Sequence, residues 1–164
     1  MHMRDHYQLM ARYNRWMNDK LYACAEPLGD AARKRDLGAF FGSVHGTLDH
    51  LLYGDSAWMG RFTGASSLPV LGETMHAEFD AMRAARQALD QRIVAWSASL
   101  TDAWLARGFT YTSSVDDRTR TLPAWTLVTH MFNHQTHHRG QVTTLLKQLG
   151  VDPGVTDLPW LLAP

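Results

Sequence analysis

Apolar residues recur at steps of three and four from the start of the chain. The first series is Leu9, Tyr13, Trp16, Met17, Leu21, Cys24 and Leu28. This spacing predicts an amphipathic helix over about 4–28, because residues three and four apart share one helix face. Pro27 and Gly29 are expected to end it.

Two further series predict the next two helices. Phe40, Phe41, Val44, Leu48, Leu51, Leu52, Trp58, Met59 and Phe62 favour a helix over about 37–62, and a linker follows at 63–69. Met75, Phe79, Met82, Leu89, Ile93 and Trp96 favour a helix over about 73–97.

After the third predicted helix, the apolar residues no longer follow a helical spacing. Phe109, Tyr111, Thr119 and Thr121 bracket the polar stretch 113–117, which predicts a short hairpin or extended excursion. Thr121, followed by Leu122 and Pro123, is a suitable cap for a fourth helix reaching Gly150. Its apolar stripe is Trp125, Val128, Met131, Phe132, Val142, Leu145, Leu146 and Leu149. In the tail, Trp160, Leu161 and Leu162 can pack back onto the helices.

Four helices of this length would each be about 37 Å long at 1.5 Å per residue. The predicted fold class is therefore all-α: one four-helix-bundle domain over 1–164, with the hairpin before its last helix. Because segment 64–72 and the hairpin lengthen two connections, the topology need not alternate up and down.

Charge and composition exclude several classes. Sixteen Lys and Arg balance sixteen Asp and Glu, so no basic excess favours nucleic acid as a partner. No apolar run approaches the ~20 residues of a membrane span, and segment 1–7 is too polar for a signal peptide. We therefore expect a cytoplasmic protein with no membrane partner. The single cysteine, Cys24, excludes an internal disulfide.

Nine histidines stand out, and four lie close together in the last predicted helix: His130, His134, His137 and His138. Imidazoles at i and i+4 lie one above the other on a helix and can reach one metal ion. At ~100° per residue, His138 lies about 40° and His134 about 80° from the centre of the apolar stripe, against about 120° or more for the other two. His134 and His138 are therefore the inner pair.

A useful metal site needs a third ligand from a neighbouring helix. The second helix offers His45, about 85° from its apolar centre, and His50, about 135° away. Periodicity favours His45. Small residues beside His50, namely Gly46, Gly54 and Ala57, would instead let another helix approach closely. The residues alone leave the choice open, and pH-sensitive packing or a polar interface would also account for the cluster. The His-Glu-x-x-His pattern of metalloproteases is absent.

The chain resembles the DinB/YfiT-like superfamily of bacterial metal-binding four-helix bundles. The resemblance covers nearly the whole chain and is most specific over 130–141, with further matching stretches at 13–18, 42–50 and 58–62. It implies a three-histidine site of His50, His134 and His138 that holds a divalent ion such as zinc or nickel. It also places Asp49 where many relatives carry asparagine, which adds an acid near the site. At Gly140, in mid-helix, we expect close helix packing.

Two functions follow from this resemblance. One is a metal-dependent enzyme, of thiol-dependent transferase or hydrolase type, that acts on a small thiol or electrophile; His45, Asp49, His130 and His137 are then candidates for proton transfer. The other is a non-catalytic metal-binding stress-response module. Either would form a homodimer, as relatives commonly do.

Overall fold

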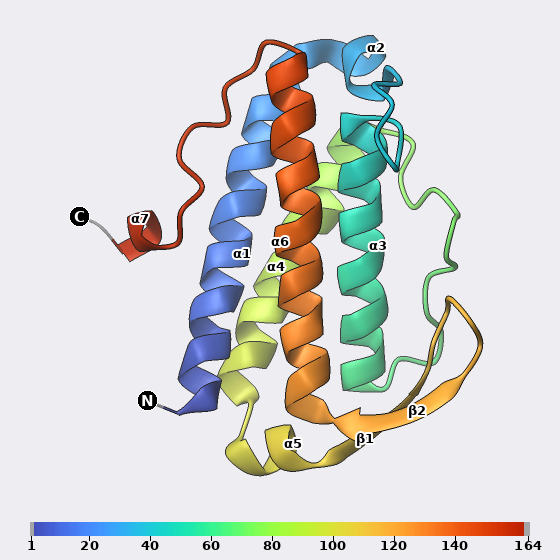
Figure 1. Ribbon diagram of the computed structural model, residues 1–164, viewed down its shortest axis with the longest axis vertical. Helices are drawn as coiled ribbons and strands as arrows, with labels where there is room; N and C mark the ends of the chain where they lie inside the picture. Colours follow the sequence, from blue (N-terminus) through green and yellow to red (C-terminus); the bar gives the residue numbers. More distant parts are fainter. Residues whose placement is uncertain (1, 163–164) are drawn as a thin grey trace.

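The computed structural model describes residues 2–162 and contains four long helices packed side by side (Figure 1). These are α1 (Met3–Ala25), α3 (Val44–Thr63), α4 (Phe79–Ser99) and α6 (Ala124–Gln148). The predicted all-α bundle is thus confirmed. Within the described residues, no helix combines the length and the hydropathy needed to cross a membrane.

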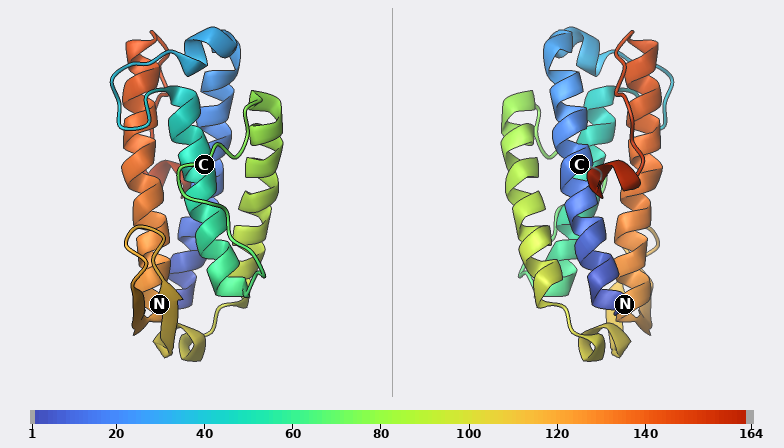
Figure 2. Two further views of the ribbon diagram at one scale, coloured as in Figure 1. Left: turned by 90° about the vertical axis from the view of Figure 1, so that its right-hand side faces the viewer. Right: turned by 90° about the vertical axis from the view of Figure 1, so that its left-hand side faces the viewer.

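The bundle does not alternate up and down. Helices α1 and α6 run in one direction while α3 and α4 run in the other, so α3 and α4 are parallel neighbours (Figure 2). Residues 64–78 connect them by running back along the outside of the bundle, and we call this segment the crossover strap. The most extensive helix contacts join α1 with α4 and α3 with α6. The second of these pairs carries the histidines.

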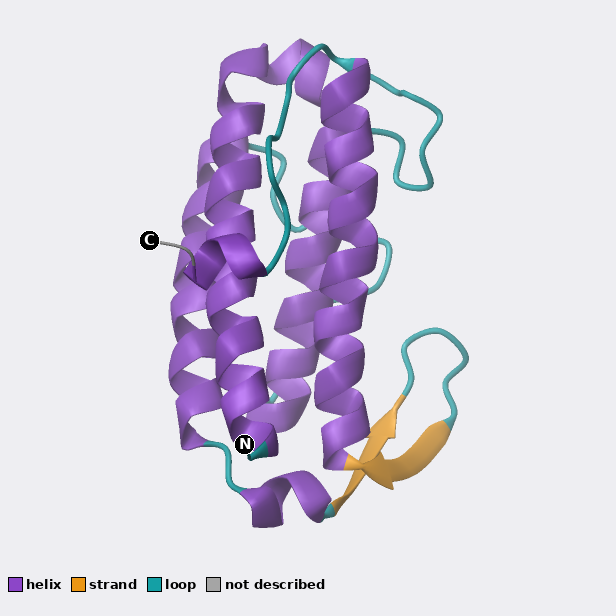
Figure 3. Ribbon diagram, turned by 60° about the vertical axis from the view of Figure 1, so that its left-hand side comes forward, coloured by secondary structure: helices purple, strands orange, loops and turns teal. Residues whose placement is uncertain are grey.

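Short elements close the two ends of the bundle (Figure 3). At one end, the 3-10 turn η1 (Glu26–Leu28) and α2 (Gly29–Lys34) follow α1. At the other, α5 (Asp102–Ala106) leads into an antiparallel hairpin of β1 (Gly108–Thr112) and β2 (Thr119–Pro123). The hairpin expected before the last helix is confirmed. Neither α2 nor α5 was predicted, because each is too short to show a helical period.

The second long helix begins later than expected, at Val44 rather than near residue 37. Gly38 and Gly42 adopt positive φ angles of 74° and 71°, which fold the preceding segment into a tight loop. Ser43 then caps the helix by accepting a hydrogen bond from the Gly46 amide. Phe40, assigned by its spacing to the core, is 85% exposed in this loop.

The boundaries of the later helices also shift. Helix α4 begins at Phe79, not near residue 73, because the crossover strap extends that far. Thr121 does not cap α6: it lies in β2, where its hydroxyl hydrogen-bonds with that of Thr110 at 2.8 Å. The backbone stays extended up to Pro123, whose ring is compatible with the position before the first helical residue.

The C-terminal segment packs back only in part. Tyr13 on α1 donates a hydrogen bond to the carbonyl of Thr156, and Leu161 in α7 (Pro159–Leu162) contacts the core. Trp160 and Leu162, by contrast, are 58% and 62% exposed. The expectation that they pack against the bundle is wrong.

A buried ionic cluster lies in the core of the bundle. Arg86 on α4 contacts Asp55 of α3 at 2.8 Å and Asp90 at 2.7 Å, and all three side chains are at most 2% exposed. Asn18 on α1 donates hydrogen bonds to both carboxylate oxygens of Asp90. Burial alone would lower the pKa of Arg86, but Asp90 and Asp55 outweigh it and raise that pKa. The guanidinium is therefore firmly charged, and the cluster joins α1, α3 and α4.

Candidate metal centre

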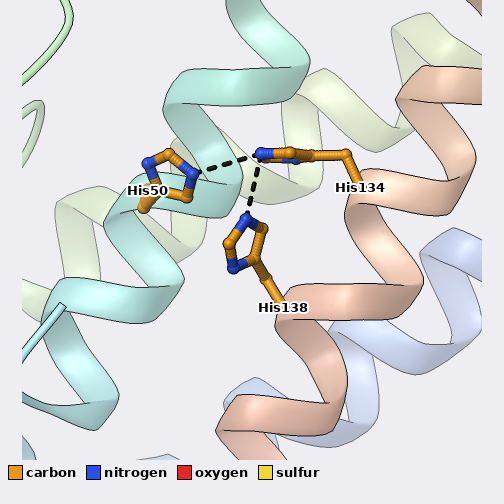
Figure 4. A group of neighbouring side chains, drawn as sticks. All are labelled: His50, His134 and His138. Atoms are coloured by element: carbon orange, nitrogen blue, oxygen red, sulfur yellow. Dashed lines mark hydrogen bonds between the residues drawn. The ribbon is translucent and has the colours of Figure 1, made fainter. Parts of the chain in front are cut away.

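Three imidazoles converge between α3 and α6 (Figure 4). His50 comes from α3, while His134 and His138 come from successive turns of α6. The Nε2 atom of His134 lies 3.1 Å from Nε2 of His50 and 3.0 Å from Nε2 of His138. One nitrogen from each ring lies within 4.8 Å of the others. The structure therefore brings together the three residues indicated by the family resemblance.

The donor set fits a divalent transition metal. A tetrahedral zinc ion with Zn–N distances of 2.0–2.1 Å needs ligand nitrogens about 3.3 Å apart, which is close to the spacing seen here. Nδ1–H of His138 donates to Oε1 of Gln141 at 2.7 Å, which leaves the lone pair of its Nε2 facing the cluster. Small outward shifts of the rings would open the space for an ion.

The electrostatic environment keeps the rings neutral. Burial lowers the pKa of His50 from 6.5 to about 4, with a further contribution from His138. Burial and the neighbouring imidazoles lower the pKa of His134 to about 3. Burial also lowers the pKa of His138. Because metal binding requires the unprotonated ring, the site is ready to bind at neutral pH.

Two glycines on α3 leave space for groups that pack beside the histidine cluster. A Cβ at Gly54 would lie 2.7 Å from Cε1 of His134, so any side chain there would push the ring away. A Cβ at Gly46 would lie 2.3 Å from the carbonyl oxygen of Phe41. The Phe41 ring in turn stacks on His50, with centroids 3.8 Å apart and planes 19° apart. The close approach of another helix, expected for small residues beside His50, is seen at Gly54, whereas Gly46 leaves room for the loop that precedes α3.

The other candidate ligands and proton carriers, His45, Asp49 and His137, lie outside the three-histidine group. His45, favoured by periodicity, is buried and its Nε2–H donates to the carbonyl of His76 in the crossover strap. Asp49 accepts hydrogen bonds from the backbone amides of Met75 and His76, so its carboxylate holds the strap. His137 is exposed.

One expectation about packing is wrong. A Cβ at Gly140 would meet nothing within 4 Å, so this glycine does not serve a close helix contact.

A cavity of about 340 Å³ extends from the histidines toward the hairpin. His50 and His134 border one end, and Arg61, Tyr111 and Ser114 border the other. Its walls include Tyr53, Trp58 and His130. This size is at the lower end for small-molecule sites. Three residues near the site, Phe41, Gln141 and Tyr111, were not predicted from the sequence. Only Gln141 could have been found there, because a residue three positions after His138 lies on the same helix face and can hydrogen-bond with it.

Comparison with known proteins agrees with this architecture. The model of the DinB family matches residues 3–164. This chain belongs to the DinB family. Protein DinB of Bacillus subtilis (strain 168) is 24% identical over 162 residues, which cover 94% of this chain and 92% of that protein.

A DinB-like protein from Bacillus cereus ATCC 10987, known from a crystal structure, shares the fold. The two superpose with a TM-score of 0.56 at 20% identity, over 85% of this chain and 90% of the other. Within the DinB-family fold, the present chain carries a three-histidine group that could hold a metal ion.

Proposed function

We propose that this DinB-family protein is a metal-dependent enzyme whose divalent ion, zinc or nickel, is held by His50, His134 and His138. The proposal is carried by one observation: three neutral imidazole nitrogens from two helices converge at the end of a cavity. Buried polar groups normally have complementary partners. Nε2 of His134 lies within hydrogen-bond distance of Nε2 in both other rings, but a neutral imidazole nitrogen carries either one N–H or one lone pair and cannot serve both. A cation would supply a common partner for all three.

Each neighbouring residue has a definite part. Gln141 fixes the tautomer of His138. Phe41 stacks on His50, and the absence of a side chain at Gly54 leaves room for the His134 ring. A divalent ion held by three neutral ligands would keep its full charge; as a Lewis acid it would lower the pKa of bound water to ~7 and deprotonate a coordinating thiol. The cavity walls orient the substrate and limit the entry of solvent. His130, one turn or about 6 Å along α6 from His134, borders this cavity with an imidazole able to accept a proton.

This arrangement suits a thiol-dependent transferase or a hydrolase acting on a small electrophile. A soft thiolate is a good ligand for zinc and nickel, and the cavity has room for a small molecule beside it.

Elemental analysis of protein purified without an affinity tag tests the metal site. We expect about one zinc or nickel ion per chain in the parent and a large loss in His50→Ala and in His134→Ala. His6→Ala is the matched control, since it removes an exposed histidine of α1 that lies outside the three-histidine group. Equal occupancy in all four proteins would exclude the site.

Turnover tests the enzymatic part. Purified metal-loaded protein should convert small electrophiles in the presence of a panel of low-molecular-weight thiols, and His134→Ala should not. Metal-loaded protein that is inactive on the whole panel would support the alternative, a non-catalytic metal-binding stress-response module.

We also propose a homodimer, for which Phe40 is the supporting observation. This ring is 85% exposed and lines a groove together with Leu37 and Ala39, and contiguous apolar surface marks interaction sites. Sedimentation analysis should show twice the chain mass for the parent and a shift toward monomer for Phe40→Ser. A monomeric parent would exclude this proposal.

A further inference from the structure

The far end of the cavity carries a positive charge with no acidic partner. Arg61, three turns along α3 from His50, borders the cavity opposite the histidines. Its Nη2 donates to Oγ of Ser114 at 2.7 Å and, at 3.4 Å, to the carbonyl of Thr112. Among the described residues, no carboxylate lies within ion-pair distance of it. The guanidinium thus keeps an uncompensated charge.

Aromatic rings hold this side chain in place. Its Cζ lies 4.9 Å from the centre of the Trp58 ring and 6.0 Å from that of Tyr111. Such contacts orient a guanidinium and leave its edge free for further hydrogen bonds. Partial burial also lowers the pKa of Arg61, so the charge is incompletely solvated. A charge in this condition gains most from an anionic ligand.

The cavity contains nothing that would repel an anion. No Asp or Glu is among the described residues that line it. Asp49, on the α3 turn that carries His50, has both oxygens occupied by amides of the crossover strap. Asp116 in the hairpin loop is paired with Arg120 at 2.5 Å.

We propose that Arg61 selects substrates bearing an anionic group, a carboxylate or phosphate-like group, at the end remote from the histidines. This inference rests on the proposed function and narrows its substrate class to small anions. A guanidinium binds either group through paired charge-assisted hydrogen bonds. Arg61 is then a specificity-determining residue, and Ser114 positions it.

Thiols of graded length test the selection. Mercaptopropionate, mercaptobutyrate, mercaptohexanoate and mercaptopropylphosphonate are titrated into cobalt-loaded protein, and each carboxylate is paired with its primary amide. Thiolate coordination is followed by the charge-transfer absorption of the metal, which yields Kd without turnover. We expect at least one anionic thiol to bind about 10-fold or more tightly than its neutral partner. The phosphonate shows which anion is preferred.

Variants separate charge from packing. Arg61→Gln should abolish the preference for the anion and leave Kd for the amides unchanged, whereas Arg61→Lys should keep part of the preference. Ser114→Ala removes the hydrogen bond that positions Arg61 but keeps the charge, so the preference should weaken without being lost. Arg107→Gln is the matched control, because Arg107 also stacks on a tryptophan, Trp104, but does not border the cavity. Equal Kd for acids and amides in the parent, or equal weakening of both in Arg61→Gln, would overturn the proposal.

A metal-free measurement keeps this proposal distinct from the metal site. The side-chain Nε–H resonance of Arg61 is followed by NMR while phenylpropionate or phenylpropionamide is added to metal-free protein. A saturable shift with the acid alone supports the anion site even if elemental analysis finds no metal. A bound metal together with no shift and no preference would refute the role of Arg61 and leave the proposed metal site standing.

Discussion

Two buried polar clusters in this bundle differ in composition, in charge and in access to a cavity. Around Arg86, charges of opposite sign meet at 2.8 Å between α3 and α4 and at 2.7 Å within α4, and they are almost wholly excluded from solvent. Around His134, three neutral rings of one kind meet, and two of them, His50 and His134, border a cavity. The first cluster finds its partners inside the protein: one guanidinium contacts both carboxylates, and Asn18 donates to Asp90. In the second, Nε2 of His134 cannot hydrogen-bond with both neighbouring rings at once, and the three rings could hold a metal ion.

The largest expected effect comes from breaking the ionic cluster. Arg86→Met leaves Asp55 and Asp90 buried without their counter-charge, which costs about 3–5 kcal/mol of the free energy of unfolding. Urea denaturation measures this loss. Arg83→Gln on the same helix is the control: it breaks the more exposed pair with Glu26 and should cost less than about 1 kcal/mol. A comparable small loss in Arg86→Met would show that the cluster contributes little to stability.

Acid should destabilise the histidine cluster in the metal-free protein. Above pH 6.5, His50 and His134 are neutral both folded and unfolded, so they add no pH dependence. Between pH 6.5 and about 4 the unfolded chain binds more protons than the folded one, so stability falls as the pH falls. Discounted for solvent exposure, the loss from pH 6.5 to 5 should be about 2 kcal/mol.

Urea midpoints measured across this pH range check the prediction, and His134→Asn should flatten the slope. A metal-free parent whose stability is flat over the window would contradict the assignment of these rings as buried and neutral.

Crowding the histidine site should weaken metal binding without unfolding the chain. In Gly54→Ala the new methyl group collides with the His134 ring, and we expect the affinity for zinc to fall about 10-fold or more, or about 1.4 kcal/mol. Gly140→Ala on α6 is the matched control, since its Cβ has open space. It should raise stability by about 0.5–1 kcal/mol and leave the affinity unchanged. Competition against a chromophoric chelator measures the zinc affinity of both variants.

The smallest expected effect concerns the hydrogen bond that orients His138. Gln141→Ala removes the acceptor for its Nδ1–H, and loss of such an outer partner weakens metal binding by about 10-fold at the low end of the known range. Gln148→Ala, at an exposed position on the same helix, should change nothing. The same chelator competition measures the metal affinity of both variants. Equal affinities in Gln141→Ala and the parent would mean that Gln141 does not position the His138 ring.

Much of the fold was predictable from sequence because helical periodicity is a local property. The pair His134 and His138 followed from the same rule, since residues four apart share a face wherever the helix lies. The starts of α3 and α6 were not predictable from periodicity. Phe40 and Phe41 continue the apolar spacing of α3 but lie in a loop shaped by Gly38 and Gly42.

The third histidine shows where local reasoning ends. A helical wheel assumes one buried face, but 15 of the 20 residues of α3 are buried. The crossover strap covers the side that carries His45, and Phe41 with α6 covers the side that carries His50. Which buried side meets α6 depends on tertiary packing, so periodicity preferred His45 and only the family resemblance indicated His50.

The crossover strap is held at two points, and the residues between these points border the cavities. Asp49 anchors it near one end, and Leu68 rests on Gly60 near the other. Between these anchors, Leu71 borders the cavity beside the histidines and a second, smaller one that includes Asp49. A mutation at Leu71 would therefore reshape both cavities while the helices preserve the histidine geometry.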